Sequence, residues 1–174
     1  EVLVVELGMD RFGQLSVLSE LTLPDVAIIT MIGEAHIEFF KTRANIAKAK
    51  LEITQGLKAD GTLIIPFDEP LLTTAAINQS VVHFGKKISD IDENKAETAF
   101  TFDNTRFAIP LRGRYNIMNA LAAISAGILL HIDTKDAAKA LKHFDLTKNR
   151  TETLTTAHGV TLISDVYNSN PTAV

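Results

Sequence analysis

The chain of 174 residues contains no cysteine and no tryptophan, and aromatic residues make up only 6% of it. The absence of cysteine excludes disulfides and thiolate metal sites, and it fits a reducing compartment. The formal net charge is −4, so the chain has no basic field that would attract a phosphate backbone. With few aromatic side chains as well, nucleic-acid binding has little support.

Long apolar runs are also missing. The longest apolar-rich stretch, residues 120–130, is too short and too rich in Ala and Gly to span a bilayer, and the first residues do not have the pattern of a signal peptide. Hydrophobic residues make up 46% of the chain and charged residues 22%, which is typical of a globular domain with a sizeable core. We expect a single domain over residues 1–174 that is cytoplasmic and monomeric and binds neither nucleic acid nor membrane.

A phosphate-binding loop of the form G-x-x-x-x-G-K-[ST] is missing as well, because Gly8 and Gly13 are too far from any Lys-Ser or Lys-Thr pair. Either no nucleotide binds, or this loop precedes residue 1. The chain begins at Glu1 directly before an apolar run and stops just after Asn170-Pro171, which has the pattern of a helix start. We therefore expect a piece of a longer protein, and we expect the piece alone to be catalytically inactive.

Apolar runs alternate with helical patterns in the first half of the chain. Four continuously apolar runs are predicted to be strands of a parallel sheet that is covered on both faces. They span residues 2–7, 25–32, 62–66 and 81–84. Helical spacing or helix signals lie between them, at residues 15–21, 46–57 and 70–77. This alternation predicts an α/β fold with a mostly parallel, doubly wound sheet.

The pattern changes after Gly85. Residues 86–95 are charged and are predicted to form a loop, whereas the runs on either side of Asp103-Asn104 predict a β-hairpin and hence a small antiparallel insertion. Two helices and a second hairpin are predicted beyond it. The runs of the first hairpin are 98–102 and 106–111, the helices are 115–130 and 134–144, and the runs of the second hairpin are 151–157 and 160–164.

Lys50 falls on the apolar stripe of its helix, whereas Lys48 points the other way. The stripe consists of Ile46, Ile53 and Leu57. One explanation is that the stem of Lys50 lies along the core and delivers its charge to water. The other is that desolvation lowers the pKa of Lys50 and exposes a neutral amine, which reacts with CO2 to give a carbamate. Such a carbamate is an anion suited to a metal ion.

Three polar residues, Glu6, His36 and Asp165, each follow the carboxyl end of a different predicted strand. Ligands of open α/β sheets bind beyond these ends, so we expect the three to converge. Carboxylate and imidazole ligands suit Mg²⁺ or Mn²⁺ when phosphates or waters fill the other positions, and a carbamate at Lys50 would add an anion. Each residue also has an ordinary explanation, as a cap, a hydrogen-bonded loop histidine and a helix N-cap respectively.

Six motifs, in this order, resemble the central ATP-binding domain of the Mur ligases. They are ELGMD at 6–10, IGEAHIEFF at 32–40, AKAKLEI at 47–53, RYNIMNALAA at 114–123, NRTE at 149–152 and DVYNSNPT at 165–172. The resemblance covers the whole chain. It implies a P-loop NTPase-like fold truncated at its N-terminal phosphate loop, without the family's UDP-binding and C-terminal domains.

The resemblance also implies an activity. Mur ligases use ATP to phosphorylate a carboxylate of a UDP-linked precursor, and an amine then attacks the acyl phosphate. Within the family, the run YNSNP at 167–171 favours the branch that adds D-Ala-D-Ala to UDP-N-acetylmuramoyl-tripeptide in peptidoglycan synthesis. Glu6 would bind the Mg²⁺ that bridges the ATP phosphates. His36 would bind a second Mg²⁺, which the carbamylated Lys50 would support.

The nucleotide would be bound by residues from later motifs. Asn116 and Asn119, which lie one helical turn apart, would bind the adenine, and Asp165 would bind the ribose. Arg150 would contact the phosphates, which makes it an expected catalytic residue together with Lys50 and His36.

The sequence departs from the family pattern at three positions, none of which removes an expected ligand. Met31 stands where Asn is usual, Phe12 replaces a common Pro, and Val166 replaces a small polar residue. Two other interpretations stay open. One is a different carboxylate-amine ligase of the same superfamily, such as another Mur ligase or a folylpolyglutamate synthase. The other is a non-enzymatic binding module with this fold, whose full chain would lack the phosphate-loop lysine.

Overall fold

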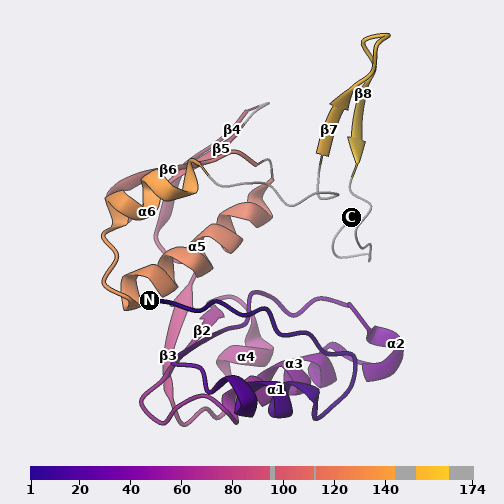
Figure 1. Ribbon diagram of the computed structural model, residues 1–174, viewed down its shortest axis with the longest axis vertical. Helices are drawn as coiled ribbons and strands as arrows, with labels where there is room; N and C mark the ends of the chain where they lie inside the picture. Colours follow the sequence, from indigo (N-terminus) through magenta and orange to yellow (C-terminus); the bar gives the residue numbers. More distant parts are fainter. Residues whose placement is uncertain (95–96, 112, 144–151, 165–174) are drawn as a thin grey trace.

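The computed structural model of the chain describes residues 1–94, 97–111, 113–143 and 152–164. A parallel sheet and an antiparallel sheet lie on either side of one long helix, α5 (Arg114–Leu129), as Figure 1 shows. Helix α5 contacts strands of both sheets. The predicted α/β class, with a parallel sheet and a small antiparallel insertion, is confirmed.

The parallel sheet has the strand order β1-β2-β3. Its strands are β1 (Val26–Ile28), β2 (Thr62–Pro66) and β3 (Ser80–Phe84). In the register of the sheet, Ile64 of β2 lies opposite Ile28 on one side and Val82 on the other. Parallel neighbours need crossover connections, which short helices supply. These are α2 (Ile37–Phe40), α3 (Arg43–Leu51) and the 3₁₀ turn η1 (Glu52–Thr54) before β2, and α4 (Pro70–Thr73) after it.

Strand β2 is buried on both faces, which explains why its sequence is apolar throughout. Leu63 and Ile65 belong to the core cluster formed with α3 and α4, whereas Ile64 belongs to the cluster formed with α5. All three side chains are at most 1% exposed. Each contributes about 1.5–3 kcal/mol to the free energy of unfolding by leaving water. The sheet is therefore covered on both sides, as the sequence predicts.

The antiparallel sheet comprises β4 (Ile88–Glu93), β5 (Thr98–Phe102) and β6 (Thr105–Ile109), in that order. Strands β5 and β6 form the predicted hairpin. Asp103 and Asn104 both have positive φ, 46° and 56°, as a two-residue type I′ turn requires. Phe100 and Phe107 lie opposite each other with their ring centroids 5.4 Å apart, and both are buried in the α5 cluster.

The remaining elements also follow the sequence pattern. They are α1 (Gln14–Thr22), α6 (Thr134–Leu141), β7 (Glu152–Thr155) and β8 (Thr161–Ser164). Helix α6 starts after Asp133, whose carboxylate accepts a hydrogen bond from the Lys135 amide at 2.8 Å. It packs on β6 and α5. No helix in the described part of the chain is long and apolar enough to cross a membrane.

The predicted loop over residues 86–95 is wrong, because β4 occupies most of it. Strand β4 lies at the edge of its sheet, with a register shift between Ser89 and Asp92, and only Ile88 is partly buried. An edge strand has one neighbour, and charged side chains on it discourage pairing with other chains. Its sequence therefore lacks the apolar alternation by which strands are recognised.

The predicted strand over residues 2–7 is also wrong, because these residues form no regular secondary structure. Val4 is 89% exposed. An apolar run becomes a strand only where another strand supplies hydrogen-bonding partners, and β1 pairs within the described residues with β2 alone. Two further elements are shorter than predicted. They are β1, expected over 25–32, and α4, expected over 70–77.

Gly56, two residues after η1, lies directly against the backbone of α1. Its amide donates to Ser19 Oγ at 3.1 Å, and a Cβ on Gly56 would lie 2.1 Å from the carbonyl carbon and oxygen of Ser19. We expect Gly56→Ala to lower the free energy of unfolding by about 1–3 kcal/mol, because backbone atoms must move apart. Urea denaturation would measure this loss. Gly8→Ala is the matched control, because its Cβ would meet nothing within 4 Å, and an equal effect of both substitutions would contradict the prediction.

Candidate functional site

The candidate site lies where the chain leaves the carboxyl end of β1. The buried residues Ile29 and Ile32 lead into a loop that carries His36 in the position before α2. His36 has left-handed backbone angles, φ 59° and ψ 24°, and its exposed side chain makes no capping hydrogen bond. Left-handed angles are uncommon outside glycine and are held only where the surrounding structure imposes them. The imidazole is therefore presented to solvent by a constrained turn.

A cavity of about 850 Å³ brings the first two motifs together. It is open to solvent, and His36 lines it together with residues from the 8–14 segment and the first half of α1. The lining residues are Gly8, Met9, Asp10, Phe12, Gly13, Gln14, Val17, Leu18 and His36. Of the three residues expected to converge, His36 lines the cavity and Glu6 does not, while Asp165 lies outside the described residues. Lys50 is not among the lining residues either.

Side chains of α1 and η1 hold the 8–14 segment in place. Gln14 Oε1 accepts from the amides of Asp10 at 2.7 Å and Arg11 at 3.0 Å, and Gln14 Nε2 donates to the Asp10 carboxylate at 2.9 Å. The Gly13 amide donates to both oxygens of Glu52, at 2.9 and 2.8 Å. This wall of the cavity is thus tied to the end of the helix that carries Lys50.

Phe12, which lines the cavity, contacts Phe40 at the end of α2. Its ring meets that of Phe40 edge to face, with centroids 5.2 Å apart and planes at 88°. Phe40 is buried in the core next to α3, and such a pair stabilises beyond its buried area by about 0.5–1.5 kcal/mol. A proline at position 12 has no aromatic ring and could not make this edge-to-face contact, so the departure from the family pattern has a structural role here.

Lys50 lies on the inner side of α3, as predicted, while Lys48 is exposed. Its amine donates to the carbonyl oxygen of Met31 at 2.8 Å. Burial lowers the pKa of Lys50, because the ammonium loses hydration that a neutral carbonyl only partly replaces. Among the described residues no carboxylate forms an ion pair with it. The amine therefore reaches the foot of the His36 loop, and its charge is not held there by an anion.

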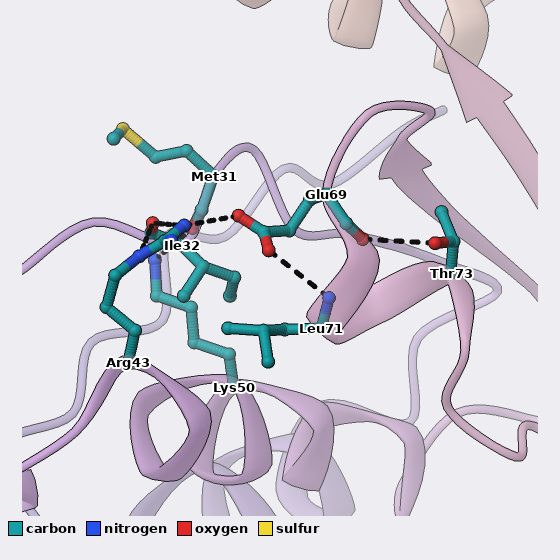
Figure 2. A network of polar contacts seen from close by, with 7 residues as sticks. All are labelled: Met31, Ile32, Arg43, Lys50, Glu69, Leu71 and Thr73. Atoms are coloured by element: carbon teal, nitrogen blue, oxygen red, sulfur yellow. Dashed lines mark hydrogen bonds and ion pairs between the residues drawn. The ribbon is translucent and has the colours of Figure 1, made fainter.

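Arg43, at the first position of α3, was not identified from the sequence. Its Nε and Nη2 donate to the Ile32 carbonyl oxygen at 3.3 and 2.9 Å, and Nη2 pairs with Glu69 Oε2 at 2.6 Å. Figure 2 shows Arg43 and Lys50 rising from α3 toward the backbone of Met31 and Ile32, with Glu69 approaching from the other side. The two partners of Arg43 are 11 and 26 residues away in sequence, so no local pattern signals them.

Asn116 and Asn119 lie one turn apart near the start of α5. Asn116 is buried and Asn119 is exposed, and the Asn119 Nδ2 lies 3.5 Å from the Asn116 Oδ1. Neither lines the cavity beside His36. Arg150 and Asp165 lie outside the described residues, so the structure does not test their predicted places.

A family model for the Mur ligase middle domain matches residues 1–127. The chain belongs to the Mur ligase middle-domain family. The resemblance predicted from the six motifs is thus confirmed. The match includes Glu6, His36 and Lys50 as well as both asparagines of α5, and it ends before Arg150 and Asp165.

Individual Mur ligases align with nearly the whole chain. It is 42% identical over 182 aligned residues to UDP-N-acetylmuramoyl-tripeptide–D-alanyl-D-alanine ligase of Bacillus subtilis, an alignment that covers 100% of this chain and 40% of that protein. The chain thus spans less than half the length of this relative. A crystal structure of MurF from Acinetobacter baumannii has a TM-score of 0.86 at 25% identity, with 95% of this chain and 39% of that chain covered. MurF ligase from Thermotoga maritima in complex with ADP has a TM-score of 0.78 at 25% identity, with 94% and 40% covered.

The donor atoms of Glu6 and His36 show whether these two residues suit a magnesium ion. Among the described residues no three His, Asp or Glu side chains form a cluster that would hold a metal ion alone. Mg²⁺ usually takes only one or two protein ligands and completes its shell with water and substrate phosphates. Glu6 and His36, both exposed, therefore fit an ion that is held largely by a nucleotide.

Proposed function

We propose that the chain is the central, ATP-binding part of a ligase that adds D-Ala-D-Ala to UDP-N-acetylmuramoyl-tripeptide during peptidoglycan precursor synthesis. The observation that carries this proposal is the 42% identity to the Bacillus subtilis ligase over the whole chain. The complex of the Thermotoga maritima relative with ADP supports a nucleotide in this fold. Because the reaction consumes ATP and a UDP-linked precursor, we place the protein in the cytoplasm.

The proposed reaction has two steps. A terminal carboxylate oxygen of the tripeptide attacks the γ-phosphorus of ATP, which forms an acyl phosphate and releases ADP. The amine of D-Ala-D-Ala then attacks the acyl carbon, the carbon–oxygen bond to phosphate breaks, and the nitrogen loses a proton as the amide forms. Both steps require that negative charge on phosphoryl oxygens be neutralised.

Glu6, His36 and Lys50 are the proposed metal site. Magnesium, when bound, would neutralise charge on the phosphoryl oxygens. The Lys50 ammonium would lose one proton to become a neutral amine. The amine would then add CO2 and lose a second proton, which gives a carbamate with one negative charge. Two features of its surroundings support this: burial lowers its pKa, and the acceptor at Met31 needs only the single N–H that a carbamate keeps.

The proposed nucleotide contacts come from other segments. Asn116 and Asn119 would donate and accept hydrogen bonds at the adenine edge, which suits two amides one turn apart on a helix. Arg150 would bind the phosphates and Asp165 the ribose hydroxyls. His36 and Arg150, with the modified Lys50, are the proposed catalytic residues.

The substrate assignment is tested with the full-length protein that contains this chain. Phosphate release would be measured with ATP, Mg²⁺ and four substrate pairs in turn. One pair is UDP-N-acetylmuramoyl-tripeptide with D-Ala-D-Ala; the others are L-Ala, D-Glu and a diamino acid, each with its matching UDP-linked precursor. We expect release only with D-Ala-D-Ala. Release with one of the other amines, each with its matching precursor, would assign the chain to another carboxylate-amine ligase. No release with any amine would favour a binding module.

For the chain of 174 residues alone, we expect no measurable ATP binding in the presence of Mg²⁺. The backbone amides and lysine of a G-x-x-x-x-G-K-[ST] loop, which hold the β- and γ-phosphates, are not in its sequence. Isothermal titration calorimetry would detect binding in the micromolar range. Such binding would show that other groups of the chain hold the phosphates.

In the full-length protein, Lys50→Ala should nearly abolish turnover at saturating Mg²⁺ and leave the fold intact. Alanine is a strong helix former and suits the half-buried side of α3. A small added carboxylate that occupies the vacated space should partly restore activity. The control is Lys48→Ala, on the exposed side of the same helix, which should change little. Near-wild-type turnover of Lys50→Ala would disprove the carbamate role.

Asn119→Ala in the full-length protein should raise the KM for ATP more than it lowers kcat. Contacts with adenine are made alike in the ground state and the transition state, so their loss weakens binding uniformly. Loss of one such hydrogen bond should cost about 1–3 kcal/mol. Steady-state kinetics over a range of ATP concentrations would measure both parameters, and a defect confined to kcat would exclude a role in adenine binding.

A further inference from the structure

The foot of the His36 loop is held by two side chains of a single helix. The consecutive carbonyl oxygens of Met31 and Ile32 accept hydrogen bonds from Lys50 and Arg43, respectively. Arg43 and Lys50 are seven residues apart, which is close to two helical turns, so both project from one side of α3 (Figure 2). Helix α3 therefore fixes the chain at two adjacent points just before the loop begins.

Glu69 determines where the Arg43 guanidinium lies. Its side chain is only 12% exposed, and it sits between the carboxyl end of β2 and α4. One carboxylate oxygen accepts from the Leu71 amide at 3.2 Å and so caps α4, while the other pairs with Arg43 at 2.6 Å. Because the guanidinium is a rigid planar fork, a group that bonds Glu69 and the Ile32 carbonyl at once has little freedom to move.

Only three residues, Gly33 to Ala35, separate the clamped carbonyl of Ile32 from His36. Gly33 is buried, and the amides of Ile37, Phe39 and Phe40 bond back to carbonyls of Glu34 and His36. The loop is thus a short, internally bonded unit attached at its foot. A shift of the Ile32 carbonyl would be passed to His36 with little loss.

We propose that Arg43 and Glu69 are positioning residues that hold the Ile32 carbonyl and thereby set the placement of His36 relative to Lys50 for catalysis. This inference rests on the proposed ligase function. Neither residue lines the cavity beside His36, so both act through the loop. Arg43 is nearly half exposed, and an ion pair of that kind stabilises a fold only slightly. Loss of the Arg43 side chain should therefore affect turnover more than folding.

The test uses Arg43→Met in the full-length protein, because Met keeps the length of the stem and removes every donor. We expect kcat to fall at least tenfold and the KM for ATP to change less than twofold. The matched control is Lys58→Met. It removes an ion pair of 2.5 Å with Asp25, which precedes the opposite end of β1, and should leave kcat within twofold of wild type.

Hydrogen exchange supplies a readout independent of activity. Peptides covering residues 33–40 should exchange at least tenfold faster in Arg43→Met than in wild type and at the wild-type rate in Lys58→Met. Unchanged exchange, or a kcat within twofold of wild type, would overturn the proposal. If wild type itself shows no ligation, the proposed function fails, while the exchange rates still decide whether Arg43 holds the loop.

A second, more conservative substitution tests the proposal in case Arg43→Met fails to fold. Glu69→Gln keeps the size of the side chain and its capping oxygen but loses the charge that fixes Arg43, and we expect kcat to fall three- to tenfold. If the two residues form one clamp, the double variant should be no slower than Arg43→Met alone. Effects that multiply would show that Glu69 acts independently, which contradicts the proposal.

Discussion

The burial of β2 from both faces is the constraint on which the rest of the structure depends. Leu63 and Ile65 enter one core cluster and Ile64 the other, so the strand can be displaced toward neither side. Its two parallel neighbours are then placed by register, and the carboxyl ends of β1 and β2 come to lie at the same edge of the sheet. This is why Ile32 and Glu69, which follow different strands, are both within reach of Arg43.

The parts of the fold that were predictable from sequence are those in which local pattern and tertiary role coincide. Strand β2 is a continuous apolar run because both faces are buried, and the β5–β6 hairpin has Asp103-Asn104 where its turn requires positive φ. Pattern and role diverge in β4, a polar edge strand, and in residues 2–7, an apolar run without a described partner strand. Whether a segment forms a strand depends on a second segment that pairs with it. The sequence of β4 or of residues 2–7 alone therefore does not determine whether either becomes a strand.

The candidate site divides in a similar way. The inward direction of Lys50 follows from helical periodicity. The rule that parallel strands gather ligands at their carboxyl ends accounts for the place of His36 beyond β1, but not for that of Gly8 to Asp10, because residues 2–7 form no strand. The clamp of Arg43 and Glu69 could not be predicted, because it joins a helix start to a cap 26 residues later. The acceptor of Lys50 could not be predicted either, because it is a backbone carbonyl, a group that every residue has.

His36 meets two demands at once, one chemical and one conformational. The imidazole faces solvent in the cavity, while the backbone beneath it adopts φ 59°, a value that asparagine, aspartate and histidine tolerate far better than other side chains. An alanine at this position would remove the ring and also strain the turn, so its effect on activity would mix two causes. Asparagine lacks the ring but accepts the turn. Few residue types are therefore compatible with this position, even before metal binding is considered. Substitutions chosen from these few types distinguish the effect of losing the imidazole from the effect of disturbing the turn.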